Sequence, residues 1–236
     1  MPVIDFHSHI LPEIDDGSKD LETSLEMLRM SAAQGVTDMV ATPHFYASKE
    51  GFETYLEKRI HAFETLCASR TPDMPRIHLG AEVAFFKGIS QAEKIEELAE
   101  QTGRILLLEM PFMEWTDRDI QEVERMASCG RYTLMLAHLE RYMGMSENKK
   151  KLKQLLEFPA VVQINAESLL DWKKRGKLIR MFRKGQAEVL GSDCHGIHHR
   201  QPNLANGREV LEKKLGREFL EQMDAQGSRL LRIEGE

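Results

Sequence analysis

Histidine and carboxylate residues follow short apolar runs at several places in the sequence, and these residue types bind divalent metal ions. The set is His7, His9, Asp16, His44, Glu82, Glu109, His138, Asp193 and His195. Imidazole and carboxylate without thiolate suit Zn²⁺, Mn²⁺, Fe or Co better than a thiolate site or a pure Ca²⁺ cage. The set is too large for one ion. We therefore predict two or three divalent ions, with Glu82 as a candidate to bridge two of them.

The spacing of these residues supports a shared site. Successive residues of a strand point to opposite faces, so His7 and His9 point the same way, as do Asp193 and His195. The alternative for the first pair is a surface turn. The apolar run that leads into His7 favours a strand instead.

Seven short runs, β-branched or rich in leucine, have the character of buried parallel strands. They are Val3–His7, Asp38–Thr42, Ile77–Glu82, Ile105–Glu109, Thr133–His138, Val161–Asn165 and Glu188–Asp193. Helical patterns lie between them. The first is expected to begin at Ser18 as N-cap and to stop at Gly35. The others are expected near Thr54–Ala68, Ala92–Gln101, Asp117–Ser128, Lys149–Leu156, Ser168–Phe182 and Asn203–Leu215.

Seven strand–helix units predict either a closed α/β barrel or a doubly wound sheet. The position of the ionisable residues favours the (β/α)7 TIM-like barrel. Six of the seven strands end in a metal-ligand residue type, and the exception ends in Asn165 and Glu167. The carboxyl ends of barrel strands converge on one face, where active sites are built.

The bulk properties indicate one globular domain over residues 1–236. Apolar residues make up 42% and charged residues 30% of the chain, as in ordinary globular proteins. We expect a cytoplasmic protein, because the sequence has neither a signal-peptide pattern nor a long apolar run that could insert into a membrane. The net charge of −6 and the absence of a basic run argue against a nucleic-acid partner.

Six motifs carry a resemblance to a known family. They are IDFHSHILPEIDDGSKD, ATPHF, GAEV, LLLEMP, AHLERY and GSDCHG, in this order between residue 3 and about residue 205. The ordered series resembles the polymerase-and-histidinol-phosphatase (PHP) superfamily. Within it, the series is similar to the bacterial metal-dependent tyrosine-phosphatase branch of capsule and exopolysaccharide loci.

The resemblance implies a distorted seven-stranded barrel and three metal positions. His7, His9, Glu82 and Asp193 would hold the first ion, and Glu82, Glu109 and His138 the second. Asp16, His44 and His195 would hold the third. It also implies a phosphotyrosine protein as substrate, with a bacterial tyrosine kinase of polysaccharide export as the expected partner. A metal-activated hydroxide would attack phosphorus directly, without a phospho-enzyme.

Two arginines match positions of the phosphatase branch, and both follow predicted strand ends. Arg141 and Arg200 are expected to bind the phosphate, because a guanidinium fork fits a phosphate dianion. The alternative for each is a surface arginine paired with a loop carboxylate. Phe85, Phe86, Phe112 and Trp115 follow two of the strands and either line an aryl slot or pack in the core.

Cys194 and Arg200 also satisfy the C-x5-R pattern of thiolate-based tyrosine phosphatases. That loop needs small residues whose backbone N–H groups cradle phosphate, and here it reads HGIHH. The adjacent Asp193 would raise the pKa of the thiol. We therefore expect Cys194 to have no catalytic role. The sequence assigns no role to His198 and His199.

Three other functions remain open. A small-molecule phosphatase of the histidinol-phosphate type would use the same chemistry with a different pocket. A metal-dependent nuclease is disfavoured by the lack of a basic groove pattern. A non-catalytic metal-stabilised module is disfavoured by the complete set of candidate ligands.

Overall fold

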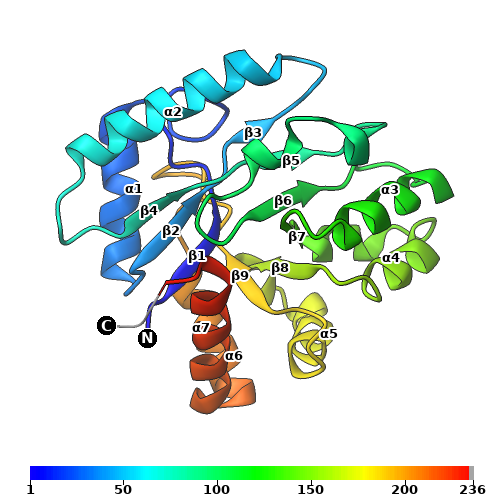
Figure 1. The fold of residues 1–236 in the computed structure, drawn as a ribbon. Coiled ribbons are helices and arrows are strands. Elements are labelled where there is room, and N and C mark those ends of the chain that lie inside the picture. Colours follow the sequence, from blue (N-terminus) through cyan, green and yellow to red (C-terminus); the bar gives the residue numbers. More distant parts are fainter. Residues whose placement is uncertain (234–236) are drawn as a thin grey trace.

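The computed structural model describes residues 1–233, which form an α/β fold around a curled parallel sheet (Figure 1). The strands are β1 (Ile4–Ser8), β2 (Asp38–Ala41), β3 (His44–Phe45), β4 (Arg76–Leu79), β5 (Glu82–Ala84), β6 (Ile105–Glu109), β7 (Thr133–Leu136), β8 (Val161–Asn165) and β9 (Val189–Gly191). The α-helices are α1 (Leu21–Ala33), α2 (Phe52–Ser69), α3 (Asp117–Ser128), α4 (Lys149–Leu155), α5 (Trp172–Arg183), α6 (Leu204–Leu215) and α7 (Arg217–Leu231). The 3₁₀ helices are η1 (Ile89–Gln91), η2 (Ile95–Leu98), η3 (Leu139–Gly144) and η4 (Ala166–Leu169).

All strand pairings between these elements are parallel, which confirms the predicted parallel arrangement. One sheet has the order β1-β2-β4 and the other has the order β3-β5-β6-β7-β8-β9. The predicted strand at Asp38–Thr42 is continued by β3 after Thr42 and Pro43. The predicted strand at Ile77–Glu82 is divided between β4 and β5 at Gly80 and Ala81. Pro43 has no N–H to donate, which explains the break in the ladder beside it.

The first and last strands lie side by side. Ser8 and Cys194 form a parallel bridge, and the His9 amide donates to the Cys194 carbonyl at 2.9 Å. The curl therefore brings the carboxyl ends of β1 and β9 together. Helices cover the outer face of the sheet, as Figure 1 shows for α1 and α2 on one side and α3 to α5 on another.

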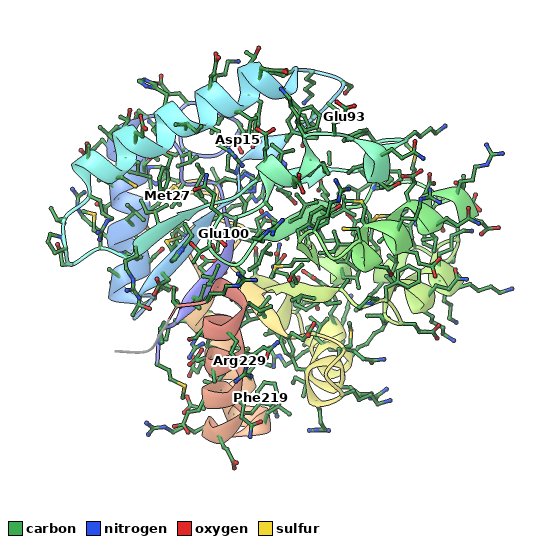
Figure 2. All side chains as sticks on the ribbon, in the orientation of Figure 1. Asp15, Met27, Glu93, Glu100, Phe219 and Arg229 are labelled. Atoms are coloured by element: carbon green, nitrogen blue, oxygen red, sulfur yellow. The ribbon has the colours of Figure 1, made fainter. Side chains whose placement is uncertain are left out.

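Apolar side chains fill two layers. The larger lies between the sheet and the helices and includes Met27 of α1 (Figure 2). The smaller includes Ile105 and Leu107 of β6 and Val161 of β8. Because side chains alternate along a strand, Glu109 continues the row of Ile105 and Leu107. The second layer thus ends, at the carboxyl edge of the sheet, in polar residues.

Most predicted helices are confirmed, but two predictions are wrong. Ser18 is not an N-cap: its amide donates to the His9 carbonyl, and Asp20 caps α1 through the Thr23 amide at 2.7 Å. No α-helix forms at Ala92–Gln101 in the described chain, where only η2 is helical. The buried guanidinium of Arg59 donates to the Glu97 and Leu98 carbonyls and so takes acceptors that a continuing helix would use.

The prediction missed α7, which packs on β1. Gly227 interrupts its helical pattern, because glycine lowers helix propensity. A Cβ at this position would lie 3.1 Å from the Phe6 ring and 3.2 Å from Ile4, so the close approach of α7 to β1 favours glycine here. Within residues 1–233, none of the helices combines the length and apolar character needed to cross a bilayer.

Candidate metal centre

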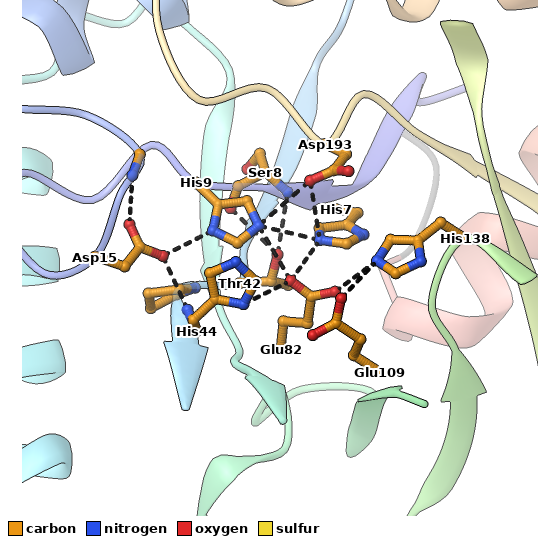
Figure 3. A network of polar contacts seen from close by, with 12 residues as sticks. His7, Ser8, His9, Asp15, Thr42, His44, Glu82, Glu109, His138 and Asp193 are labelled. Carbon is orange, nitrogen blue, oxygen red and sulfur yellow. Dashed lines mark hydrogen bonds and ion pairs between the residues drawn. The ribbon is translucent and has the colours of Figure 1, made fainter. Parts of the chain in front are cut away.

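The structure brings the predicted ligands together at the carboxyl edge of the sheet, and Figure 3 labels all of them except Asp16 and His195. They come from the carboxyl ends of β1, β6, β7 and β9 or from residues just after them, from the first residues of β3 and β5, and from the loop before α1. Each strand buries its apolar residues and so fixes where its last side chain emerges. Four groups of ligand atoms lie close enough to share an ion: His9–His44–His195, His7–His9–Glu82, His7–His138–Asp193 and His44–Glu82–Glu109.

Glu82 occupies the middle of the cluster and is 1% exposed. Its Oε2 atom lies 3.2 Å from His7 Nε2, 3.3 Å from His9 Nε2 and 3.0 Å from His44 Nδ1. Its Oε1 atom lies 2.9 Å from His138 Nε2. One buried carboxylate thus contacts four imidazoles, which is the geometry of a bridging ligand.

Asp193 faces the same histidines from β9. Its Oδ1 atom lies 3.5 Å from the Nε2 atoms of both His7 and His9, and 3.6 Å from His195 Nδ1. His7 Nε2 and His9 Nε2 are only 3.1 Å apart. The two imidazoles therefore direct nitrogen atoms toward one point beside a carboxylate.

The remaining candidates extend the cluster on two sides. Asp16 is 70% exposed, and its Oδ1 atom lies 3.6 Å from His44 Nε2 and 3.7 Å from His195 Nε2. Glu109 Oε1 lies 3.5 Å from His138 Nε2. Every ligand predicted from the sequence is thus found within one connected cluster.

Burial and neighbouring charges shift the pKa values in opposite directions. Burial alone would lower the pKa of His9, but the hydrogen bond with Asp15 and the nearby charge of Glu82 raise it to about 10. Burial, then the charge of Glu82, raises the pKa of Glu109 to about 7. Burial, then His9, lowers the pKa of His195 to about 4. Burial and groups of like charge thus disfavour the charged forms of Glu109 and His195, and a nearby cation would stabilise both the ionised carboxylate and the neutral imidazole.

Two of the candidate ligands have a strained backbone. His138 has φ 33° and Asp193 has φ 54°, and Arg200 nearby has φ 48°. These values lie in the left-handed region, which non-glycine residues avoid unless the surrounding structure enforces it. Such strain concentrates at functional sites and supports a functional role for this edge of the sheet.

Several buried atoms of the cluster have no hydrogen-bond partner among residues 1–233. They are Glu82 Oε2, His44 Nδ1, His138 Nδ1 and His195 Nε2. Buried polar atoms usually find a partner, because leaving one unpaired costs about 1–3 kcal/mol. Three of these four atoms face other ligand atoms of the cluster, and this donor set fits divalent ions.

Both predicted arginines reach the cluster. Arg141 of η3 donates to Asp193 Oδ2 at 2.5 Å, and Arg200 lies 2.6 Å from Asp193 Oδ1. Their side chains are 33% and 39% exposed. Each guanidinium therefore lies between a buried ligand and solvent, where an incoming anion would meet it.

The predicted aromatic residues separate into two kinds. Trp115 is 1% exposed and belongs to the core, and Phe85 and Phe86 pack against that core. Phe112 is 57% exposed, with its ring centroid 6.3 Å from that of His138. Phe112 alone of the four is both exposed and beside the cluster.

Asp15 contacts the cluster and was not predicted from the sequence. Its Oδ2 atom lies 2.7 Å from His9 Nδ1 and accepts from the His44 amide at 2.9 Å, and its Oδ1 accepts from the Gly17 amide. Asp15 therefore orients two histidines. The sequence signal for Asp15 was the adjacent pair Asp15–Asp16. Adjacent side chains point in different directions, so the two could contact different groups, but the prediction assigned only Asp16.

Cys194 lies fully buried behind the cluster. Burial, then the charge of Asp5, raises the pKa of its thiol well above the ordinary value. A buried neutral thiol is a poor nucleophile. The geometry agrees with the expectation that C-x5-R is a coincidence here.

Comparisons with known proteins agree with this arrangement. Residues 3–231 match the sequence profile described as capsular polysaccharide synthesis, CpsB/CapC. The chain is 30% identical over 226 residues to the tyrosine-protein phosphatase CpsB of Streptococcus pneumoniae, covering 91% of each. It is 28% identical over 244 residues to the tyrosine-protein phosphatase YwqE of Bacillus subtilis, covering 98% of this chain and 92% of the relative.

A solved structure has the same fold. It comes from the crystal structures of YwqE from Bacillus subtilis and CpsB from Streptococcus pneumoniae, described as unique metal-dependent tyrosine phosphatases. The TM-score is 0.82 at 25% identity, and the match covers 99% of this chain and 96% of that chain.

Proposed function

The chain belongs to the CpsB/CapC family, and from this premise we propose that it is a metal-dependent phosphatase that hydrolyses phosphotyrosine in proteins. The observation that carries the proposal is Glu82, a buried carboxylate in contact with four imidazoles. Such a cluster is costly without cations. The names of the relatives supply the substrate class.

The proposed site has three metal positions. His7, His9, Glu82 and Asp193 would hold the first, Glu82, Glu109 and His138 the second, and Asp16, His44 and His195 the third. The short distances from Glu82 support its role as the bridge between the first two. The exposure of Asp16 indicates that the third position is the most open to solvent.

When bound, divalent ions lower the pKa of a water molecule and neutralise charge on phosphate oxygens. The protein side chains bind and orient the substrate. Arg141 and Arg200 bind the phosphate oxygens that face solvent and orient the ester for in-line attack. The leaving group of a tyrosyl phosphate is a phenol of pKa about 10, so it needs little protonation.

A cavity of about 350 Å³ adjoins the third position. Asp16, His44, Tyr46 and Lys49 are among its lining residues. It gives a substrate access to the cluster from solvent. We propose that a phosphotyrosine side chain approaches along this edge, presented by a bacterial tyrosine kinase of capsule or exopolysaccharide synthesis.

The fold that presents the site is, in this proposal, a distorted seven-stranded barrel. Two residues separate β2 from β3, and two separate β4 from β5, so each pair counts as one strand of the barrel. The Ser8–Cys194 bridge supports closure of the barrel between its first strand, β1, and its last strand, β9. A closed barrel would direct all strand ends to one face.

A side-by-side assay tests the function. A phosphotyrosine peptide, histidinol phosphate and a DNA substrate are each incubated with the protein, once with added Mn²⁺ and once with a chelator. Hydrolysis of the peptide that needs Mn²⁺ and exceeds hydrolysis of histidinol phosphate is the expected result. Preference for histidinol phosphate would support the small-molecule alternative, and peptide hydrolysis in the presence of chelator would contradict the metal requirement.

A further inference from the structure

The strand β8 supplies no candidate metal ligand, yet it carries two buried amide side chains beside the cluster. Gln163 is 0% and Asn165 is 6% exposed. Being two residues apart, they point to the same face as Val161, whose side chain belongs to the second apolar layer. Burying an amide costs free energy unless its donors and acceptors are paired, so the partners of both side chains are informative.

These amides join three candidate ligands through hydrogen bonds. Gln163 Oε1 accepts from the His138 backbone amide at 2.8 Å and lies 3.1 Å from His7 Nδ1. Gln163 Nε2 donates to Asn165 Oδ1 at 2.9 Å, and Asn165 Nδ2 donates to Asp193 Oδ2 at 2.8 Å.

The direction of this chain of hydrogen bonds is fixed at one end. The backbone amide of His138 can only donate, so the atom of Gln163 that faces it must be the oxygen. That oxygen can only accept, so His7 Nδ1 must carry a proton. A neutral His7 therefore keeps the lone pair on Nε2, the atom that faces Glu82 and Asp193.

The same orientation continues to Asp193. With its oxygen facing His7, Gln163 turns its NH₂ group to Asn165, whose own NH₂ group then faces Asp193. Asn165 and Arg141 thus both donate to Oδ2 of Asp193, while Oδ1 faces the histidines and Arg200. The chain of hydrogen bonds thus defines the donor atom of His7 and, together with the two arginines, the orientation of the Asp193 carboxylate.

Close packing holds the chain of hydrogen bonds in place. Gly191 of β9 is paired with Asn165, and a Cβ added to it would lie 2.5 Å from His7 Cβ and 2.7 Å from Gln163 Nε2. No side chain fits there. The hydrogen bond from the His138 amide to Gln163 also restrains His138 itself, whose φ of 33° is strained.

We propose that Gln163 and Asn165 are positioning residues that set which atoms of His7 and Asp193 face the metal ions. This inference rests on the proposed metal site. Partners that orient metal ligands in this way typically change metal affinity or activity by about 10–100-fold when they are removed.

Titration calorimetry with Zn²⁺ on the purified, metal-stripped full chain tests the proposal. Gln163→Met keeps the shape but can neither accept nor donate, and we expect a loss of affinity of about 10–100-fold. Gln163→Glu can still accept from His7 and His138 but, when ionised, cannot donate to Asn165, so its loss of affinity should be smaller than that of Gln163→Met. Ile164→Ala, on the opposite face of β8, is the control for destabilisation without loss of the hydrogen bonds.

Thermal unfolding of each variant is measured alongside. Unchanged affinity in Gln163→Met would overturn the proposal, as would losses in Gln163→Met and Ile164→Ala that follow their lowered unfolding temperatures. If Gln163→Met does not fold, Asn165→Ala breaks the next bond and should lose about tenfold, and natural affinity in that variant would overturn the proposal. Absence of Zn²⁺ binding by the natural protein would instead refute the metal site itself, and with it this inference.

Discussion

Histidine and carboxylate side chains are buried together at both ends of the sheet, but their hydrogen bonds differ. At the amino ends of the strands, Asp38 accepts from Arg76 at 2.9 Å and lies 2.9 Å from His78 Nε2. Glu100 (labelled in Figure 2) accepts from the Gly103 amide at 2.6 Å and lies 3.7 Å from His78 Nδ1. Both carboxylates are paired by protein groups, and we assign this cluster to stability.

At the carboxyl ends, the protein alone does not complete the pairing. Glu82 Oε2 and three imidazole nitrogens lack hydrogen-bond partners among the described residues. Burial and the charge of Glu82 raise the pKa of Asp193, and the charges of His7 and His9 more than offset them. The difference teaches that buried charge by itself does not identify a functional site. Incomplete pairing of buried charge is the more specific sign.

Substitution of Glu82 should have the largest effect. Glu82→Gln keeps the shape but removes the charge that faces four imidazoles, so two metal positions are weakened at once. We expect kcat to fall at least about 10³-fold, because the ions supply several kcal/mol of catalysis. Elemental analysis of the dialysed protein should show a matching loss of metal. Full metal content in this variant would exclude the bridging role.

The arginine next to this cluster should matter less. Arg141→Ala removes a charge-assisted hydrogen bond to phosphate, worth about 1.5–3 kcal/mol, so kcat/KM for a phosphotyrosine peptide should fall about 10–100-fold. Metal content should be unchanged. Arg141→Lys tests whether charge or the guanidinium fork is needed. Kinetics identical to those of the natural protein would remove Arg141 from the phosphate site.

The contrast between the two ends also explains what the sequence could predict. The positions of the candidate ligands other than Asp16 were predictable because each follows a run of buried strand residues, and parallel strands align their carboxyl ends. The role of Gln163 was not predictable, because an amide inside the run Val161–Asn165 acquires its partners only when β1, β7 and β9 are packed around it. The role of Asp15 likewise depends on the loop folding back to His9.

The cluster of Asp38, His78 and Glu100 at the amino ends of the strands was not predicted from the sequence. Glu100 contacts His78 only in the folded chain, and the segment Ala92–Gln101, which contains Glu100, was expected to be a helix. That expectation failed because Arg59, distant in sequence, takes the carbonyls of Glu97 and Leu98. Local patterns report local structure, whereas these contacts depend on tertiary packing.

The cluster at the amino ends should affect stability but not chemistry. Burial would lower the pKa of His78, but Asp38 and Glu100 raise it to about 9. His78→Gln should lower the free energy of unfolding by roughly 2 kcal/mol, less than for a fully buried pair, because Arg76 still neutralises Asp38. Metal content and kcat should not change.

The effect of His78 should depend on pH with a defined sign. A histidine whose pKa is raised on folding stabilises the protein below its ordinary pKa of 6.5 and loses this effect as pH rises through about 9. The difference between the natural protein and His78→Gln should therefore be largest near pH 6 and small at pH 10, as measured by urea unfolding. Arg29→Gln, on the exposed face of α1, is the control and should cost under about 0.5 kcal/mol. A difference that grows with pH would contradict the assigned charge on His78.

The smallest effect is expected at Cys194, which lies between two candidate ligands in sequence. Cys194→Ala avoids burying an unpaired hydroxyl, and kcat/KM should stay within about twofold of the natural value. The thiol is buried and its pKa is raised, so it is not the nucleophile. A loss of about 10³-fold with metal content intact, together with a trapped phosphocysteine, would reverse the comparison: the reaction would then belong to the C-x5-R loop, and the cluster around Glu82 would serve only to hold that loop in place.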